Sequence, residues 1–309
     1  MSNYSKQRQA NLENFSTDKV LHYESDSLKA ILTGCSKCVL QHDLPDRKAV
    51  FEAEQLGNYT LPDYGLTDYL PDAEAADNLV SPVFLQDNLK MMDFACGTGL
   101  MVQKLAPYFK GANPTVIGID ISAAQIDAFQ SKLQTIYRVN PSLNVQAYQY
   151  DIIDEQFDRD NSLNRPDELV EDSFDIITTT LSFHHFSELK RIVGQLLKYL
   201  KKNGKLIIVD MYDHKDQYIQ ENVDSDSPVA YHGGLSPSQI KQKLDSFHFS
   251  RLEASVKYNY EHWCGVANLE NHLPKPTVER ALREAPKRLR DGKMEYLVPR
   301  ELVLAICTK

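Results

Sequence analysis

From Leu89 onward, short apolar runs alternate with stretches in which apolar residues recur at helical spacing. The apolar runs predict buried strands at Leu89–Phe94, Thr115–Asp120, Val145–Tyr150, Phe174–Thr180 and Lys205–Met211. The stretches between them predict helices at Leu100–Phe109, Ala123–Tyr137 and Phe186–Leu200. The last helix is followed by Lys201-Lys202-Asn203-Gly204, which favours a C-terminal stop. Strands that are apolar throughout and separated by helices indicate an α/β fold, with a parallel sheet covered on both faces.

The segments on either side of this core have other patterns. Residues 1 to about 50 are polar and helix-prone, and Glu54–Val83 contains several prolines and is typical of an irregular connection. After Met211, the sequence predicts a helix, a strand, a second helix and a final strand. Their expected ranges are Ser236–Phe247, Leu252–Tyr260, Thr277–Leu289 and Leu297–Cys307. We therefore divide the chain into an N-terminal helical and irregular cap, 1–85, and a ligand-binding domain, 86–309, with a capping insertion at about 212–248.

Composition and charge narrow the class of protein. The chain has 309 residues, 42% of them hydrophobic and 25% charged, and its net charge is −9. An acidic chain does not favour nucleic-acid binding, and its one basic cluster, Arg280–Lys293, predicts a solvated helix face. No apolar run approaches the roughly 20 residues of a membrane helix, and the N-terminus has no apolar secretion signal. Five cysteines, an odd number, suit a reducing compartment, so we expect a cytoplasmic protein.

The segment Met91–Gly99, MMDFACGTG, joins a predicted strand to a predicted helix through small residues. Small residues allow a ligand to approach the backbone closely, and the helix start adds unpaired N–H groups. The segment is not a dinucleotide fingerprint, because Val102 and Leu100 stand where G-x-G-x-x-G requires small residues. It is not a P-loop either, since no Gly-Lys-Ser/Thr follows. The segment therefore predicts a small nucleoside-type ligand.

This segment resembles the first motif of the class I S-adenosylmethionine (SAM)-dependent methyltransferases. The matching residues are Asp93, Ala95, Cys96, Gly97, Thr98 and Gly99. The resemblance is strong over about Leu89–Met211 and weak elsewhere. It implies a Rossmann-like, seven-stranded and mostly parallel sheet with an antiparallel last strand. It also implies that Asp93, Ala95, Gly97 and Gly99 bind SAM.

Further cofactor contacts are expected where the next strands end, because ligands of open α/β sheets bind at the carboxyl ends of the strands. Asp120 ends the second strand about twenty residues after Gly99, where a carboxylate accepts hydrogen bonds from ribose hydroxyls. A helix-capping role in this region is the alternative. The resemblance implies that Asp151 binds the adenine amine and the Ile152 N–H a ring nitrogen, with turn capping as the alternative for Asp151. It further implies cofactor contacts from Ile121, Gln125, Leu181 and Phe183, and from Tyr23 as a lid residue.

Histidines are the candidate groups on the acceptor side. Methyl transfer from SAM is an in-line displacement that needs alignment, and it needs a general base only if the acceptor loses a proton. His184 and His185 follow the fourth strand, and His232 lies in a His-Gly segment before a helix, as in the resembled small-molecule enzymes. We take His232 and His185 as the candidate bases. For His185, a hydrogen bond that ties the loop is the alternative.

The sequence thus predicts a cytoplasmic enzyme that transfers the SAM methyl group to a small molecule and releases S-adenosylhomocysteine, as a monomer or homodimer. Two alternatives stay open. One is a protein or RNA methyltransferase, although the chain is acidic and has no Asn/Asp-Pro-Pro-aromatic motif after the fourth strand. The other is a non-catalytic SAM-binding regulatory protein. Tyr258, Tyr260 and Trp263 either line the acceptor pocket or pack in the sheet, and the lone Cys35–Cys38 pair leads us to expect no metal site.

Overall fold

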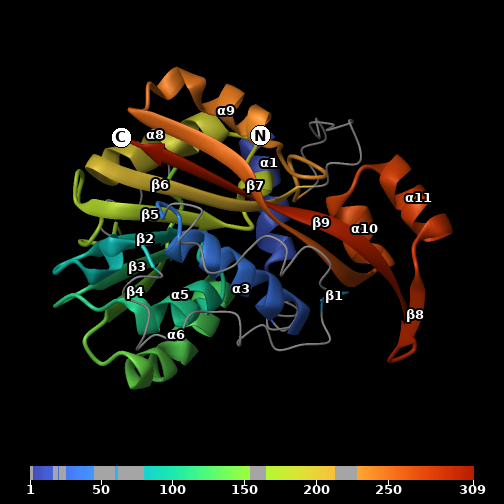
Figure 1. The fold of residues 1–309 in the computed structure, drawn as a ribbon, viewed down its shortest axis with the longest axis horizontal. Helices are drawn as coiled ribbons and strands as arrows, with labels where there is room; N and C mark the ends of the chain where they lie inside the picture. Colours follow the sequence, from blue (N-terminus) through green and yellow to red (C-terminus); the bar gives the residue numbers. More distant parts are fainter. Residues whose placement is uncertain are drawn as a thin grey trace.

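One mixed sheet runs through the molecule (Figure 1). The structure, a computed structural model, describes residues 3–16, 20, 26–44, 60–61, 80–153, 165–212 and 228–309. Within these residues the sheet has nine strands, in the order β1-β7-β9-β6-β5-β2-β3-β4, with β8 paired to β9. The strands are β1 (Thr60–Leu61), β2 (Lys90–Phe94), β3 (Thr115–Asp120), β4 (Asn144–Gln149), β5 (Phe174–Thr180), β6 (Leu200–Tyr212), β7 (Arg251–Gly265), β8 (Lys287–Arg290) and β9 (Lys293–Thr308).

Strand directions confirm the predicted parallel core with an antiparallel last strand. Strands β4, β3, β2, β5 and β6 are parallel neighbours, and β9 runs antiparallel between β6 and β7. The described sheet exceeds the expected seven strands because β1 and β8 are added at its far end. Both join the distal part of the long β7–β9 pair, which extends from Arg251 opposite Thr308 to Gly265 opposite Glu295.

Helices cover both faces of the sheet (Figure 1). Those of the described residues are α1 (Asn3–Asn14), α3 (Asp26–Leu40), α5 (Leu100–Leu105), α6 (Ala123–Val139), α8 (Leu189–Tyr199), α9 (Pro237–Leu244), α10 (Val266–His272) and α11 (Lys275–Glu284). Helices α8 and α9 lie on one face and α3, α5 and α6 on the other, while α10 and α11 stand beyond the sheet's carboxyl end. None of the described helices combines the length and apolarity needed to cross a bilayer.

Strand pleating divides the core into two layers. Met91 and Met92 are consecutive and fully buried, yet Met91 packs in the layer under α3, α5 and α6, and Met92 in the layer under α8 and α9. Successive side chains of a strand point to opposite faces, so a doubly covered strand is apolar at every position. A third, smaller cluster holds α10 and α11 against the distal parts of β7 and β9.

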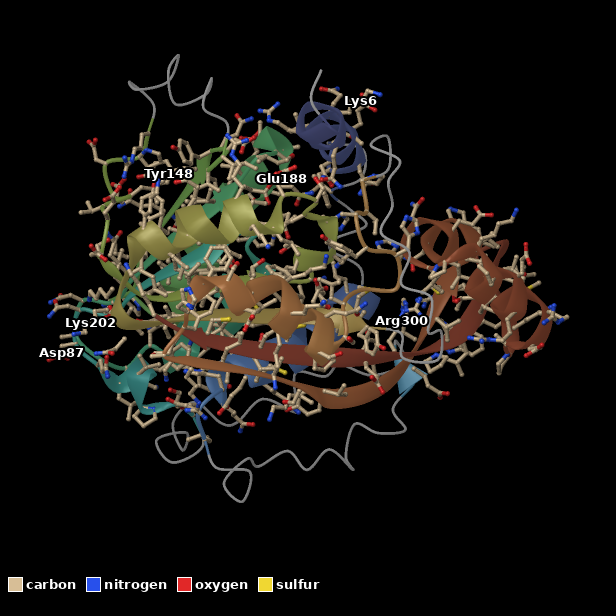
Figure 2. All side chains as sticks on the ribbon, turned by 90° about the horizontal axis from the view of Figure 1, so that it is seen from above. Lys6, Asp87, Tyr148, Glu188, Lys202 and Arg300 are labelled. Carbon is tan, nitrogen blue, oxygen red and sulfur yellow. The ribbon has the colours of Figure 1, made fainter. Side chains whose placement is uncertain are left out.

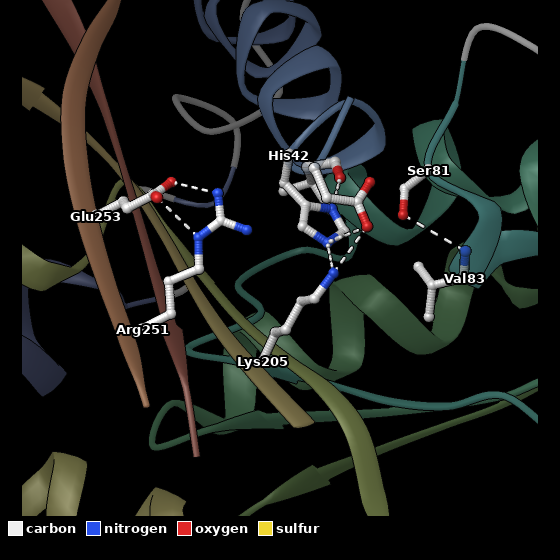
Figure 3. Close-up of polar contacts among 8 residues, drawn as sticks. His42, Ser81, Val83, Lys205, Arg251 and Glu253 are labelled. Carbon is white, nitrogen blue, oxygen red and sulfur yellow. Dashed lines mark hydrogen bonds and ion pairs between the residues drawn. The ribbon is translucent and has the colours of Figure 1, made fainter. Parts of the chain in front are cut away.

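Helix α3 belongs to the body of the protein, although it lies in the N-terminal segment. Its residues Cys35, Val39 and Leu40 have no exposed surface. Just beyond its end, the Lys205 ammonium on β6 donates to His42 Nε2 at 3.0 Å and to Asp43 Oδ2 at 2.8 Å (Figure 3). Burial lowers the pKa of His42 to about 4, so the neutral ring accepts this hydrogen bond.

One strand start and one helix end differ from the prediction. Helix α8 ends at Tyr199, within one residue of its expected end, but the chain continues directly into β6, where Leu200 pairs with Phe174 of β5. Residues Lys201–Gly204 therefore lie in a strand that was expected to begin at Lys205. The helix expected to reach Leu289 ends at Glu284. Pro286 explains this helix end, since proline lacks the N–H that a helix needs and disfavours the helical conformation of the preceding residue. Leu289 lies in β8 instead.

Candidate functional site

A cavity of about 810 Å³ opens at the carboxyl ends of the parallel strands. This volume lies within the range of small-molecule and cofactor sites, about 300–1,000 Å³. Figure 2 shows that Arg300, which lines the cavity, lies toward the α10–α11 end of the molecule, opposite Lys202 and Asp87. The residues predicted to bind a ligand that do line it are Asp93, Ala95, Gly97, Asp120, Ile121, Gln125, Asp151, Ile152, Leu181 and His185.

The glycine loop after β2 turns through left-handed backbone conformations. Ala95, Gly97 and Gly99 have φ of 56°, 53° and 75°. A side chain on Gly99 would meet the Phe129 ring of α6, which lies 2.3 Å from the position of its Cβ. Glycine is therefore required at Gly99 by both conformation and space, and the loop can press closely against α6.

Asp120, at the end of β3, is the carboxylate that holds this loop. Its Oδ2 accepts a hydrogen bond from Gly97 N at 3.0 Å, and its Oδ1 accepts one from Ser122 N at 2.9 Å. Its side chain is buried at the cavity, and burial raises its pKa to about 6. Each carboxylate oxygen has further acceptor capacity, so the group suits a ligand that offers hydroxyl donors.

Asp93, at the end of β2, carries an unused acceptor. Its Oδ1 accepts a hydrogen bond from Thr178 Oγ1 at 3.0 Å, whereas Oδ2 has no hydrogen-bond partner among the described residues. Only 1% of Asp93 is exposed, and burial raises its pKa to about 7. An unsatisfied buried oxygen at a cavity wall is costly unless a ligand supplies the missing donor.

Helix α1 lies across three of the loops that follow the strands. Arg8 Nε donates to Asp151 Oδ2 at 2.7 Å, after β4. Ser122, after β3, donates its hydroxyl to the Phe15 carbonyl at 2.8 Å, and Ser187 N, after β5, donates to Gln7 Oε1 at 3.0 Å. The first helix thus covers the ends of strands from different parts of the chain.

Among the described residues, three of the four imidazoles that line the cavity, those of His184, His185 and His272, lie close together. His184 faces Asp210 at the end of β6, with Nδ1 2.7 Å from Oδ1 and its backbone N donating to Oδ2 at 2.8 Å. His185 Nδ1 is 2.7 Å from the Pro228 carbonyl, and His272 Nδ1 is 2.9 Å from the Asn268 carbonyl. Burial lowers the pKa of His185 well below its ordinary value and that of His272 to about 3. Both rings are therefore neutral at pH 7.

Comparison with known proteins decides the family. Residues 85–266 match the methyltransferase domain family. This chain belongs to that family. It is a class I, SAM-dependent methyltransferase, and the buried Asp93 oxygen, the Asp120 carboxylate and the close glycine loop fit the cofactor that this family uses.

Individual relatives of the methyltransferase are distant. The uncharacterized methyltransferase C1347.09 of Schizosaccharomyces pombe is 24% identical over 294 residues, 94% of this chain and 96% of its own length. A carboxy-S-adenosyl-L-methionine synthase of Yersinia enterocolitica is 22% identical over 229 residues, 69% of this chain and 79% of the synthase. The solved structure of YcgJ from Bacillus subtilis is 18% identical and covers 72% of this chain and 92% of its own, with a TM-score of 0.45.

Some predicted site residues of the methyltransferase lie off the cavity wall. Gly99 shapes the loop from behind, and Phe183, 1% exposed, packs in the core under α8 and α9. His232 is half-buried, with Nδ1 3.4 Å from the Leu273 carbonyl, and it is not part of the lining. Tyr23 lies outside the described residues.

The aromatic residues of β7 separate into the two roles that the sequence left open. Tyr258 and Tyr260 are buried in the core on the α3 side of the sheet. Trp263 lines the cavity, with the Arg288 guanidinium 4.4 Å from the centre of its ring. Its indole Nε1 is buried and has no hydrogen-bond partner among the described residues.

Sequence reasoning missed several residues at the site of the methyltransferase. Asp210 could have been predicted from the sequence, because this aspartate lies at the end of a predicted strand, as Asp93 and Asp120 do. Arg8 and His272 carry no such signal. They come from segments far from the predicted strand ends in sequence, and only the packing of α1 and α10 brings them there.

Proposed function

We propose that this methyltransferase acts on a small molecule and releases S-adenosylhomocysteine. The supporting observation is that one cavity contains both the carboxylates expected to bind the cofactor and a separate wall of histidines with Trp263. A cavity of about 810 Å³ is of the size that holds a cofactor with a small acceptor beside it.

The cofactor half of the cavity is assigned from the strand ends. We assign the ribose hydroxyls to Asp120, the adenine to Asp151 and Ile152 with Ile121 and Gln125 as walls, and the methionine part to Asp93 and the Leu181 segment. The Arg8 contact to Asp151 supports the assignment of α1 as a cover for the adenine end. When bound, SAM supplies an electrophilic methyl group. The protein's contribution is to align the acceptor with it and to exclude water.

The acceptor half is assigned to the wall that carries Trp263, Arg300 and His185. Arg300 is 4% exposed and lines the cavity. The Trp263 N–H is a donor that can orient a polar acceptor. His185 is neutral and lines the cavity, whereas His232 does not, so His185 is the better placed of the two predicted bases for an acceptor that must lose a proton.

The substrate class, the compartment and the assembly of the protein also form part of the proposal. The net charge of −9 argues against an RNA substrate, and five buried free cysteines suit the cytoplasm. We keep the monomer or homodimer as the expected assembly, and the N-terminal segment 1–85 with the insertion at about 212–248 as the parts that set acceptor specificity. A protein substrate and a non-catalytic role become outcomes of the test below.

The test is an untargeted metabolite screen with isotopically labelled SAM. Purified protein is incubated with a metabolite extract and SAM at a concentration near its Kd for the wild type, and labelled products are sought by mass spectrometry, with Asp120→Asn as the variant expected to bind SAM weakly. We expect a labelled small molecule that forms with the wild type and not with the variant. Label found only in protein or RNA, or SAM binding without any labelled product, would overturn the small-molecule assignment.

Once the acceptor is known, the role of His185 as a general base can be tested by measuring methylation of that acceptor. If the methylated atom loses a proton, His185→Ala should lower kcat by about 10²–10⁴-fold, the usual contribution of a general base. His232→Ala should have a smaller effect. Unchanged turnover in both variants would exclude general-base catalysis by either histidine.

A further inference from the structure

Three histidines from two distant segments meet at the cavity wall. His184 and His185 follow β5, and His272 ends α10. One ring nitrogen of each lies within 4.8 Å of those of the other two. The ring centres of His184 and His185 are 4.2 Å apart, and that of His272 lies 5.9 and 6.4 Å from them. The three rings thus bring one nitrogen each to the same place on the cavity wall.

The hydrogen bonds of the three rings leave the same atom free in each. Nδ1 faces an acceptor in all three, namely the Asp210 carboxylate, the Pro228 carbonyl and the Asn268 carbonyl. In the neutral tautomer that donates through Nδ1, the other nitrogen, Nε2, keeps its lone pair and can bind a metal ion. His184 Nε2 is buried and has no hydrogen-bond partner among the described residues, and His184 itself is 3% exposed.

This pattern is the one that metal-binding histidines share. A ligating imidazole usually donates its other N–H to a carboxylate or a backbone carbonyl, which fixes the ring and its tautomer. His184 with Asp210 has the carboxylate form of this pairing, and His185 and His272 have the carbonyl form. Asp210 is itself fixed by hydrogen bonds from the backbone N–H groups of His184 and Met211.

We propose that His184, His185 and His272 bind a divalent transition-metal ion, with zinc as the reference case, through their Nε2 atoms. Imidazole ligands suit Zn²⁺, Cu²⁺, Ni²⁺ and Fe²⁺ rather than Mg²⁺ or Ca²⁺. In a tetrahedral site with zinc–nitrogen distances of about 2.0–2.1 Å, ligand nitrogens lie roughly 3.4 Å apart. One nitrogen of each ring already lies within 4.8 Å of those of the other two, so side-chain rotations can bring three ligand atoms to this spacing.

Three protein ligands leave a coordination position open, as in catalytic rather than structural zinc sites. The three histidines line the cavity, so that position is reached from the acceptor side. One consequence rests on the proposed function: a hydroxyl or thiol acceptor bound to the ion loses its proton to solvent and keeps the lone pair that receives the methyl group. His185 would then be a ligand and not a base. The binding site itself depends on no acceptor.

The direct test is metal binding by the untagged full-length chain, measured without SAM or acceptor. Zn²⁺ is titrated in competition with a chromophoric chelator, and Co²⁺ is titrated as a visible-absorption probe. We expect one ion per chain. His272→Ala should weaken zinc binding by about 100-fold or more, and Asp210→Asn by about 10–100-fold, as for other supporting carboxylates. The matched control is His248→Ala, because His248 is exposed and does not line the cavity.

A second measurement does not rely on the folding of any variant. X-ray absorption of the wild type with one equivalent of Zn²⁺ should show three imidazole nitrogens at about 2.0–2.1 Å. The proposal is overturned if the wild type binds no stoichiometric ion, if His272→Ala binds zinc as tightly as His248→Ala does, or if the spectrum shows mainly sulfur ligands. None of these outcomes bears on methyl transfer, which the labelled-SAM screen tests separately.

Discussion

At the scale of single residues, the carboxylates at the strand ends carry the assigned cofactor chemistry. Asp120 is buried, and its pKa is raised to about 6, yet both of its oxygens accept backbone hydrogen bonds that fix its position. Burial favours the neutral acid, whereas donors on a ligand favour the carboxylate. Ligand binding at Asp120 is therefore linked to its ionisation.

We expect SAM affinity to depend on pH through this group. Ribose hydroxyls donate to the ionised form, so affinity is full well above pH 6 and falls as the pH decreases through 6, to about tenfold weaker at pH 5. The pKa of Asp93 is raised to about 7, so protonation of Asp93 should begin to weaken SAM binding at a higher pH than protonation of Asp120 does. Calorimetric titration of SAM between pH 8 and pH 5 measures both.

The matched variants are Asp120→Asn and Asp245→Asn. The first should bind SAM roughly 100-fold more weakly, since a hydrogen bond to a charged group contributes about 1.5–3 kcal/mol. Its remaining affinity should change less between pH 6 and pH 5 than that of the wild type. Asp245 is exposed and does not line the cavity, so its variant should behave as the wild type does. An Asp120→Asn protein with the wild-type affinity would contradict the ribose assignment.

At the scale of elements, β3 and α6 form the support of the glycine loop. Phe129 of α6 is fully buried and lies against both Gly99 of the loop and Gly118 of β3. Ser122 caps α6 by accepting a hydrogen bond from Gln125 N at 3.4 Å, two residues after the carboxylate that holds Gly97. The position of the loop is thus set by how closely a helix packs on a strand.

Gly118→Ala should push these elements apart. A Cβ there would lie 2.6 Å from the Phe129 ring and 3.0 Å from Cys96 Sγ, and an overpacked core costs about 1–3 kcal/mol. Urea unfolding should show this loss, with weaker SAM binding alongside it. Gly265→Ala is the control for stability, because its Cβ would have no neighbour within 4 Å. Phe129→Leu should recover part of the loss only in the Gly118→Ala background, and simple additivity of the two changes would refute the contact.

At the scale of the whole molecule, the cavity is lined by two parts of the protein that differ in how many apolar side chains they bury. Two large core clusters hold the sheet between its helices, whereas a small cluster of six buried residues holds α10 and α11. The acceptor wall draws residues from both, since His185 lies at the main body and Trp263 and His272 lie at this extension. Regions with few buried apolar contacts open locally at low free-energy cost.

Hydrogen exchange should separate the two parts. We expect the amides of α11 and β8 to exchange much sooner than those of β2 and β5. Leu269→Ala, in the small cluster, removes a fully buried side chain and should cost about 2–5 kcal/mol. It should speed exchange in α10 and α11 while β5 stays protected. Leu196→Ala of α8, in a large cluster, should instead lower the protection of the whole sheet. Equal effects of both variants on β5 would show that the molecule unfolds as one unit.

Local patterns in the sequence were enough to predict the parallel core. The strands β2, β3 and β5 begin and end within one residue of their expected positions, because a strand buried on both faces must be apolar at each residue. Other boundaries were less well predicted. Pro286 marks in the sequence where α11 must end, whereas the start of β6 is fixed by pairing of Leu200 with β5, a contact between distant parts of the chain.

The sequence by itself determined the family, the sheet and the carboxylates at its edge, since motif spacing and strand ends are local properties. Only the tertiary structure decided what surrounds them. The contact of Arg8 with Asp151 joins residues 143 positions apart, and the meeting of His184 and His185 with His272 depends on where α10 packs. Local patterns cannot specify such pairs, because long-range packing alone sets the distance between them.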